Sequence, residues 1–232
     1  MYCLWCHTAF IEKVSWEYVF GRATTLPICQ QCSGSFKEIT GEICDKCGRT
    51  FSGVDPQYRH GQLCHDCVRW GDGGLVKNRS VFVYNSFLQE VIGRWKYRGD
   101  AELVKLFWPK LQILVKQFET IDAVVPIPLS PERLYERSFN QAQALAEGLP
   151  YPIVEAIIRP IGVTKQSKKS RQQRLHQEDR FQIGLVPASL CKGKSLLLVD
   201  DIYTTGATLY SAAAILKQHG AAAVYSITVA RG

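Results

Sequence analysis

The fold is decided by one stretch of the chain, SLLLVDDIYTTGATL, which runs from Ser195 to Leu209. It begins with an aliphatic run and continues into two adjacent carboxylates, Asp200 and Asp201. A short apolar run bounded by a turn is typical of a buried parallel strand. Open α/β sheets bind ligands at the carboxyl ends of such strands. The stretch therefore predicts an α/β fold with a ligand site directly after this strand.

A small, hydroxyl-rich loop follows the carboxylates, and it consists of Thr204, Thr205, Gly206, Ala207 and Thr208. Backbone N–H groups at a helix N-terminus attract anions, and glycine lets a phosphate approach the backbone closely. Carboxylates suit vicinal hydroxyls, which donate hydrogen bonds, or a divalent cation. Two carboxylates followed by a phosphate-binding loop therefore predict a ribose 5-phosphate site. The chain contains neither GxxxxGK(S/T) nor GxGxxG, which argues against a Walker loop and a dinucleotide fingerprint. The alternative is a structural turn in which Asp201 or Thr205 caps the following helix.

Composition places the chain among ordinary globular proteins. Its 232 residues allow one ordinary domain and a small one, with 46% hydrophobic and 21% charged residues. The first ten residues, MYCLWCHTAF, do not resemble a secretion signal, and no apolar run is long enough to span a bilayer. We therefore expect a cytoplasmic protein without membrane insertion. The net charge of +7 favours polyanions but does not by itself establish nucleic-acid binding.

Eight of the nine cysteines form CxxC pairs, which are Cys3/Cys6, Cys29/Cys32, Cys44/Cys47 and Cys64/Cys67. Such pairs in a reducing compartment are typical of tetrahedral zinc sites, and closed four-cysteine sites are usually structural. We expect the first two pairs to hold one Zn²⁺ and the last two to hold a second. An interleaved pairing, redox-active pairs and an iron–sulfur cluster are the alternatives.

A glycine-rich, polar segment near residues 70–78 suggests a domain boundary. We therefore expect a double zinc ribbon over residues 1–72, folded largely by its metals, and an α/β domain over residues 78–232. Hydrophobic periodicity predicts the main elements of the second domain. These are strands at 81–84, 122–128 and 222–229, and helices at 87–97, 101–118 and 141–147, with Pro109 able to split or kink the second helix.

Two arginines follow the predicted strand at 122–128. Arg133 and Arg137 are four residues apart, hence on one helical face, and their guanidinium groups suit diphosphate oxygens. Asn140 and Gln141 add further donors, although Asn140 can also cap the next helix. The alternative is a solvated basic helix face.

A second basic segment contains five cations within ten residues, Lys165, Lys168, Lys169, Arg171 and Arg174. Such a run is often only a solvated loop. Its functional interpretations are a lid that closes over diphosphate and excludes water, or a contact with a nucleic-acid backbone.

The stretch around Asp200 and Asp201 resembles the 5-phosphoribosyl 1-diphosphate (PRPP) signature of the type I phosphoribosyltransferases, over roughly residues 80–232. The resemblance implies a parallel sheet flanked by helices. It also implies that the two acids bind the ribose hydroxyls, that the loop at 204–208 wraps the 5-phosphate, and that Mg²⁺ accompanies PRPP. Catalytic roles would fall to Asp200, Asp201 and Arg137.

Two further motifs, KYRGD at 96–100 and VPIPLSPERLYERSFNQ at 125–141, narrow this resemblance. Together with the CxxC pairs, they make the chain similar to the ComF/GntX subgroup of phosphoribosyltransferase-like proteins. This implies that residues 126–141 form the diphosphate loop and that Lys96, Arg98 and Asp100 lie near the substrate. It also implies a role in natural competence and DNA uptake, with single-stranded DNA and a ComFA-type helicase as partners.

Two classes of function follow from the sequence. The first is a Mg²⁺–PRPP-dependent transferase with an unidentified nitrogen acceptor, in which preorganised cations stabilise the departing diphosphate. The second is a non-catalytic module that handles single-stranded DNA or acts as an adaptor for the helicase.

Overall fold

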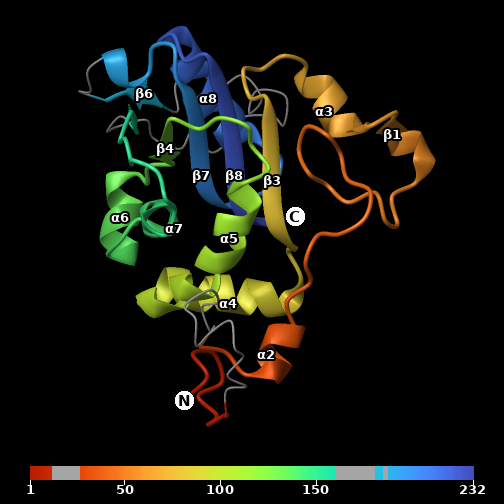
Figure 1. The fold of residues 1–232 in the computed structure, drawn as a ribbon, viewed down its shortest axis with the longest axis vertical. Coiled ribbons are helices and arrows are strands. Elements are labelled where there is room, and N and C mark those ends of the chain that lie inside the picture. The colour runs from red at the N-terminus through yellow and green to blue at the C-terminus, as the bar shows by residue number, and fades with distance from the viewer. Residues whose placement is uncertain (12–26, 160–180, 185–187) are drawn as a thin grey trace.

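A computed structural model describes residues 1–11, 27–159, 181–184 and 188–232 (Figure 1). The five cations predicted to form a lid, between Lys165 and Arg174, lie outside the described residues.

The centre of the molecule is a four-stranded sheet in the order β3-β8-β7-β4. Its strands are β3 (Lys77–Val83), β4 (Ala123–Pro126), β7 (Ser195–Tyr203) and β8 (Ala223–Arg231), and each neighbouring pair is parallel. The aliphatic run at the start of β7 is fully buried, as a central parallel strand requires. The predicted α/β class and parallel sheet are confirmed.

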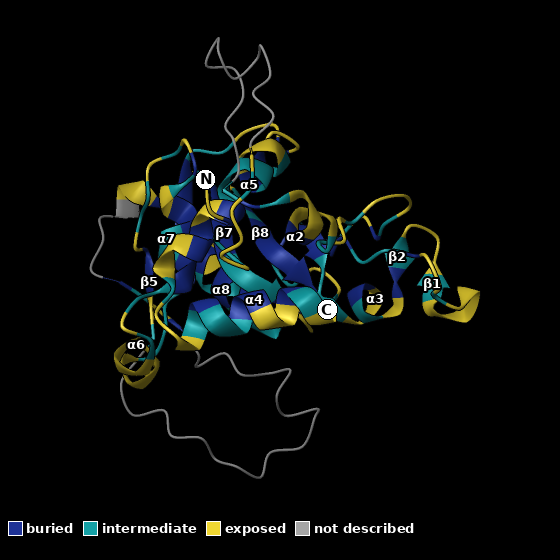
Figure 2. Cartoon of the chain, turned by 90° about the horizontal axis from the view of Figure 1, so that it is seen from below, coloured by how far each residue is buried: buried dark blue, intermediate teal, exposed yellow. Residues whose placement is uncertain are grey.

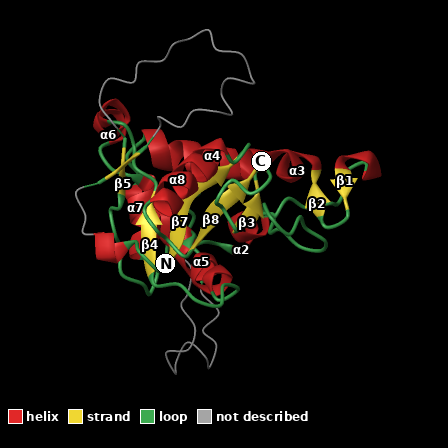
Figure 3. Cartoon of the chain, turned by 90° about the horizontal axis from the view of Figure 1, so that it is seen from above, coloured by secondary structure: helices red, strands yellow, loops and turns green. Residues whose placement is uncertain are grey.

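Helices cover both faces of the sheet (Figure 3). Successive residues of a strand point to opposite faces. Leu197 and Val199 join the core cluster that includes α4, α5 and α7, whereas Leu196 and Leu198 join the cluster that includes α8. These helices are α4 (Ser86–Tyr97), α5 (Trp108–Val115), α7 (Gln141–Glu147) and α8 (Ala207–Gln218). In Figure 2, the strands of the sheet are mostly buried, and helices such as α4 carry both buried and exposed residues.

Shorter elements complete the described chain. The helices are α2 (Gln30–Gly34), α3 (His65–Trp70) and α6 (Pro131–Arg137), with 3-10 turns at Pro56–Tyr58, Ala101–Leu106 and Ala188–Leu190. Two small antiparallel pairs join β1 (Arg59–His60) to β2 (Leu63–Cys64) and β5 (Ile157–Ile158) to β6 (Gln182–Ile183).

The helix predicted over residues 101–118 is divided at its proline. A 3-10 turn occupies Ala101–Leu106, and α5 begins separately at Trp108. Pro109 lies in the first turn of α5, where a missing backbone N–H breaks no helical hydrogen bond. The single long helix is therefore wrong, and the split that Pro109 allowed is present, with the break at Phe107.

The outer strands of the sheet are covered by extended backbone. The N–H of Ile39 donates to the carbonyl of Val81, and the N–H of Val83 donates to the carbonyl of Lys37, so residues 37–39 run along β3. On the opposite edge, residues 152–154 exchange similar hydrogen bonds with Val124 of β4. These bonds satisfy part of the donors and acceptors that the edge strands would otherwise expose.

The two groups of cysteines pack in different parts of the core. Cys3 and Cys32 belong to the cluster that contains α4 and α5, whereas Cys44, Cys47, Cys64 and Cys67 belong to the cluster that contains α8. In Figure 1, α2 lies at the lower end of the molecule, and α3 lies beside the upper part of the sheet. Each cysteine group therefore packs against the α/β core, and the boundary near residues 72–78 stays a prediction.

Replacing Leu197 with alanine should reduce the free energy of unfolding by about 2–5 kcal/mol, because the fully buried side chain would leave a cavity within the sheet core. The same change at Leu190, which is 41% exposed, should cost less than about 1 kcal/mol. Urea denaturation of both variants with saturating Zn²⁺ measures the difference. Equal costs would contradict the assigned core.

Candidate functional site

The candidate ligand site lies where β7 passes into α8. Asp200 and Asp201 stand near the end of β7, the loop occupies residues 204–206, and α8 begins at Ala207. Ala207 and Thr208 therefore form the first turn of the helix, where backbone N–H groups have no helical partner. The side chains of Thr204 and Thr205 are exposed, whereas that of Thr208 is half-buried.

Gly206 is required by the shape of this loop. Its φ of +84° lies in the left-handed region, and a Cβ atom built at this position would lie 2.3 Å from the hydroxyl oxygen of Tyr203. The hydroxyl of Thr205 accepts a hydrogen bond of 3.4 Å from the N–H of Ala207. Thr205 therefore contributes to the helix start, as the structural alternative expected, while its exposure leaves it accessible to a ligand.

The two carboxylates have different surroundings. Asp201 forms an ion pair with the ammonium of Lys96, at the end of α4, and both side chains are largely buried. Asp200 accepts a hydrogen bond of 2.9 Å from the N–H of Asp201. Burial, together with the charge of Asp201, raises the pKa of Asp200 to about 7, although the charges of Lys96 and Arg159 oppose this shift.

The arginines of α6 are not equivalent. Arg133 is exposed, whereas Arg137 is half-buried and donates a 2.9 Å hydrogen bond to the side-chain oxygen of Gln141. The guanidinium of Arg137 also lies over the ring of Tyr97, 5.3 Å from its centroid. Arg137 is therefore held between α4 and α7, which places it beside the segment that carries Lys96.

Asn140 and Gln141 are engaged in local structure. The side-chain oxygen of Asn140 accepts from the N–H of Ala142 and caps α7, and its amide donates to the carbonyl of Ile127. Gln141 is 1% exposed. The capping role that the sequence allowed for Asn140 is thus present in the structure.

Three residues near the site were not expected from the sequence. Arg159 donates to the carbonyl of Pro128 and acts electrostatically on Asp200. Trp70 and Arg231 donate hydrogen bonds to carbonyl groups of the loop, at Thr205 and Thr204 respectively. The sequence offered only weak signals for two of them: Arg231 follows an apolar strand, and Trp70 lies at the start of a polar linker.

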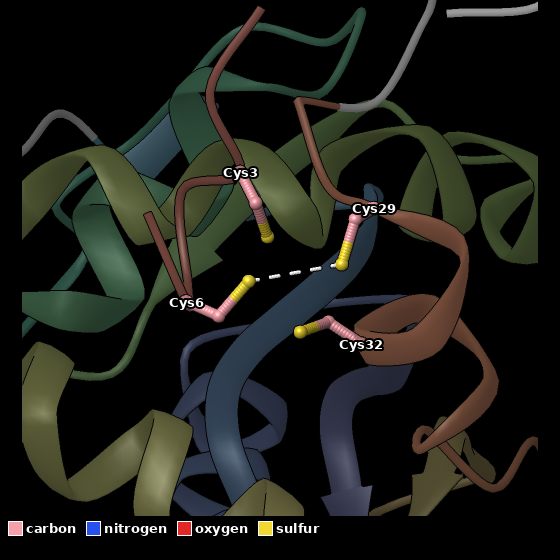
Figure 4. A group of neighbouring side chains, drawn as sticks. All are labelled: Cys3, Cys6, Cys29 and Cys32. Carbon is pink, nitrogen blue, oxygen red and sulfur yellow. Dashed lines mark hydrogen bonds between the residues drawn. The ribbon is translucent and has the colours of Figure 1, made fainter. Parts of the chain in front are cut away.

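The cysteines form two tetrads. Cys3, Cys6, Cys29 and Cys32 form the first, and their sulfur atoms point toward a common centre (Figure 4). Cys44, Cys47, Cys64 and Cys67 form the second, and the sulfur atoms of each tetrad lie within 4.8 Å of one another. This grouping confirms the predicted pairing and excludes the interleaved one.

The size of each tetrad fits Zn²⁺. Tetrahedral coordination at about 2.3 Å requires neighbouring sulfur atoms to be about 3.8 Å apart. The sulfur atoms of Cys6 and Cys29 are 3.7 Å apart, and those of Cys47 and Cys64 are 3.6 Å apart. Both tetrads can therefore hold zinc.

Comparison with known proteins agrees with this geometry. Residues 114–232 match the family described as the phosphoribosyl transferase domain. The fold and site thus define a phosphoribosyltransferase domain. The chain is 39% identical to Competence protein ComFC of Bacillus subtilis (strain 168), over 99% of this chain and 94% of that protein. It belongs to the ComF family of phosphoribosyltransferase-like proteins.

Alignments with two other relatives cover most of the chain. Competence protein ComFC of Streptococcus pneumoniae is 32% identical over 88% of this chain and 87% of that protein. The DNA utilization protein YhgH of Salmonella typhimurium is 29% identical over 85% of this chain and 87% of that protein.

None of the helices in the described ranges is long and apolar enough to cross a membrane.

The raised pKa of Asp200 predicts the pH dependence of stability. The folded state binds this proton more tightly than the unfolded state, so stability falls as pH rises from about 4 to about 7. Asp200→Asn should therefore raise the melting temperature at pH 8, and the gain should shrink toward pH 5. Thermal denaturation between pH 5 and 8 measures the gain.

Asp122→Asn provides a control of opposite sign. Hydrogen bonding to the N–H of Ser195 lowers the pKa of Asp122, so this carboxylate stabilises the fold at neutral pH. A gain for Asp200→Asn that did not change with pH would contradict the assigned environment of Asp200.

Proposed function

We propose that the chain binds PRPP with Mg²⁺ at the end of β7 and acts in DNA uptake during natural competence, in the cytoplasm. The proposal rests on one arrangement above all. A pair of carboxylates is followed within a few residues by a glycine at φ +84° and the first turn of a helix. Carboxylates that can accept hydrogen bonds from ribose hydroxyls thereby lie next to backbone N–H groups that can bind a phosphate. This arrangement matches the sugar and the phosphate of a ribose 5-phosphate.

The carboxylates suit the sugar rather than a phosphate. Asp201 already has a cationic partner in Lys96, and the two acids lie next to each other in sequence. A ligand that donates hydrogen bonds from vicinal hydroxyls satisfies carboxylate oxygens, whereas a phosphate would repel them. The 5-phosphate would lie on the backbone of residues 204–208, with the hydroxyls of Thr204 and Thr205 as further donors.

Diphosphate would lie toward α6. Arg137 is already oriented by Gln141 and Tyr97, so its guanidinium has less freedom to lose on binding a ligand. Arg133 is exposed on the same helix and can add a second cation. During transfer, negative charge builds up on the departing diphosphate, and fixed cations stabilise it. We assign that role to Arg137, supported by Arg133 and by the cations at 165–174.

Mg²⁺ would be held mainly by diphosphate and ribose oxygens and by water, while Asp200 and Asp201 would bind the ribose hydroxyls. Bound Mg²⁺ supplies charge neutralisation for the diphosphate. The chain's own contribution is to orient the anomeric carbon between the carboxylates and the arginines of α6. The acceptor would approach from the segment around Tyr97.

Replacing both acids, Asp200→Asn with Asp201→Asn, should weaken PRPP binding at least about 100-fold, because two charge-assisted hydrogen-bonding groups are lost. Calorimetric titration of PRPP with Mg²⁺ into zinc-loaded protein measures the affinity. The matched control is Glu119→Gln with Glu147→Gln, which removes two negative charges from exposed positions. Saturable binding that survives in the double asparagine variant would overturn the proposed site.

A second candidate function is direct contact with single-stranded DNA. The net charge of +7, the five cations between 165 and 174 and the names of the relatives support it. In this case the basic segment would contact phosphates of a strand supplied by a helicase partner of the ComFA type. Both functions can be combined, with PRPP as substrate or as signal.

Replacing Lys165, Lys168 and Lys169 with alanine should reduce the slope of log affinity against log salt by about 2, because each single-strand phosphate neutralised by a cation contributes about 0.7. Fluorescence anisotropy with an oligonucleotide at several salt concentrations measures the slope. An unchanged slope would assign the cations to another role. PRPP titration of the same variant tests separately whether they cover diphosphate.

A further inference from the structure

We propose that Trp70 and Arg231 are positioning residues that connect the second cysteine tetrad to the phosphate loop, so that the loaded tetrad fixes the geometry of that loop. The phosphate loop here means residues 204–206. The inference deepens the proposed function and rests on it for the identity of the ligand. The link between tetrad and loop is itself independent of any ligand.

Trp70 joins α3 to the loop. It lies three residues after Cys67, at the end of the helix that begins next to Cys64. Its ring is stacked on Tyr210 of α8, with the ring centroids 4.3 Å apart and an angle of 10° between the planes. Its indole N–H donates a 2.9 Å hydrogen bond to the carbonyl of Thr205. A single side chain thus connects the metal-binding segment with both the loop and the helix that follows it.

Arg231 makes the second connection, from the end of β8. One guanidinium nitrogen donates to the carbonyl of Thr204 at 2.9 Å and more weakly to that of Tyr203 at 3.4 Å. The other guanidinium nitrogen lies 3.8 Å from the sulfur of Cys47. The guanidinium also lies 4.6 Å from the centroid of the Tyr203 ring. The same side chain therefore contacts a metal-ligating sulfur and two carbonyls at the start of the loop.

Burial of Arg231 calls for a negative partner. The residue is 5% exposed, and a buried charge without a counterion is costly. The ion pairs found among the described residues involve other side chains. Four thiolates around one Zn²⁺ carry about two negative charges in total. The loaded second tetrad would therefore place negative charge beside Arg231, whose guanidinium also donates to the backbone oxygens of Tyr203, Thr204 and Gly232.

These contacts orient the N–H groups of the loop. In a trans peptide, the C=O and the following N–H point in opposite directions. The carbonyls of Thr204 and Thr205 are held by Arg231 and Trp70, so the N–H groups of Thr205 and Gly206 point away from these two side chains. Fixing the carbonyls in advance reduces the reorganisation that a phosphate would otherwise have to drive.

The test uses Trp70→Phe in the full chain, because phenylalanine keeps a ring for stacking on Tyr210 and removes only the N–H donor. Two ligands with Mg²⁺ are titrated separately, ribose 5-phosphate and inorganic pyrophosphate. We expect ribose 5-phosphate to bind about five- to tenfold more weakly, the effect of one lost hydrogen bond. Pyrophosphate, which would bind at α6, should change by less than about twofold. A merely weakened fold would reduce both affinities.

Trp108→Phe is the matched control. Trp108 also donates its indole N–H to a backbone carbonyl, that of Ala144 in α7, at 2.9 Å. The Trp108→Phe variant should bind ribose 5-phosphate and pyrophosphate within about twofold of the unaltered protein. Zinc content, measured on every variant, verifies that the tetrads are loaded.

A second measurement does not depend on the ligand. Amide hydrogen exchange at residues 204–208 should be faster in Trp70→Phe and in Arg231→Met, by about five- to tenfold, and Arg231→Lys should restore part of the protection. Unchanged exchange in both Trp70→Phe and Arg231→Met, or equal weakening of both ligands, would overturn the inference. If the unaltered protein bound neither ligand, the proposed function would fail, while the exchange rates would still decide whether the tetrad holds the loop.

Discussion

Two adjacent carboxylates at the end of a buried strand are the constraint on which the rest of the site depends. Removing such charges from water costs several kcal/mol unless cations compensate. The compensating side chains come from distant parts of the chain: Lys96 ends α4, and Arg159 follows β5. The site is therefore assembled by the tertiary fold, and its acids are kept ready for a ligand that brings hydroxyl donors or a divalent cation.

The sequence was sufficient for local features and insufficient for long-range ones. Apolar runs identified the strand before Asp200, and CxxC spacing identified both tetrads. Periodicity alone joined residues 101–118 into one helix, because it does not measure the effect of Pro109 on the backbone. Trp70 lies 135 residues from its acceptor, and no local pattern encodes such a contact. Asn140 shows a further limit, since a cap and a ligand donor have the same sequence signal.

The two tetrads differ in what they stabilise. The first is attached to α4, where Arg94 donates to the carbonyl of Trp5, and α4 also carries Lys96. The second is attached to α3, β8 and the loop before α8 through Trp70 and Arg231. Metal coordination can thereby fix the shape of each cysteine-rich segment. The second cysteine-rich segment thus contacts the loop at residues 204–206 through the side chain of Trp70.

The position of β8 has a consequence for synthesis on the ribosome. It is the last strand in chain order, yet it lies inside the sheet, between β3 and β7. The second tetrad spans only residues 44–67 and can capture its metal early in translation. The sheet itself cannot close until β8 is in place, because β3 and β7 both pair their backbone groups with β8 and would otherwise leave those edges unpaired. Metal capture by the second tetrad can thus precede closure of the sheet.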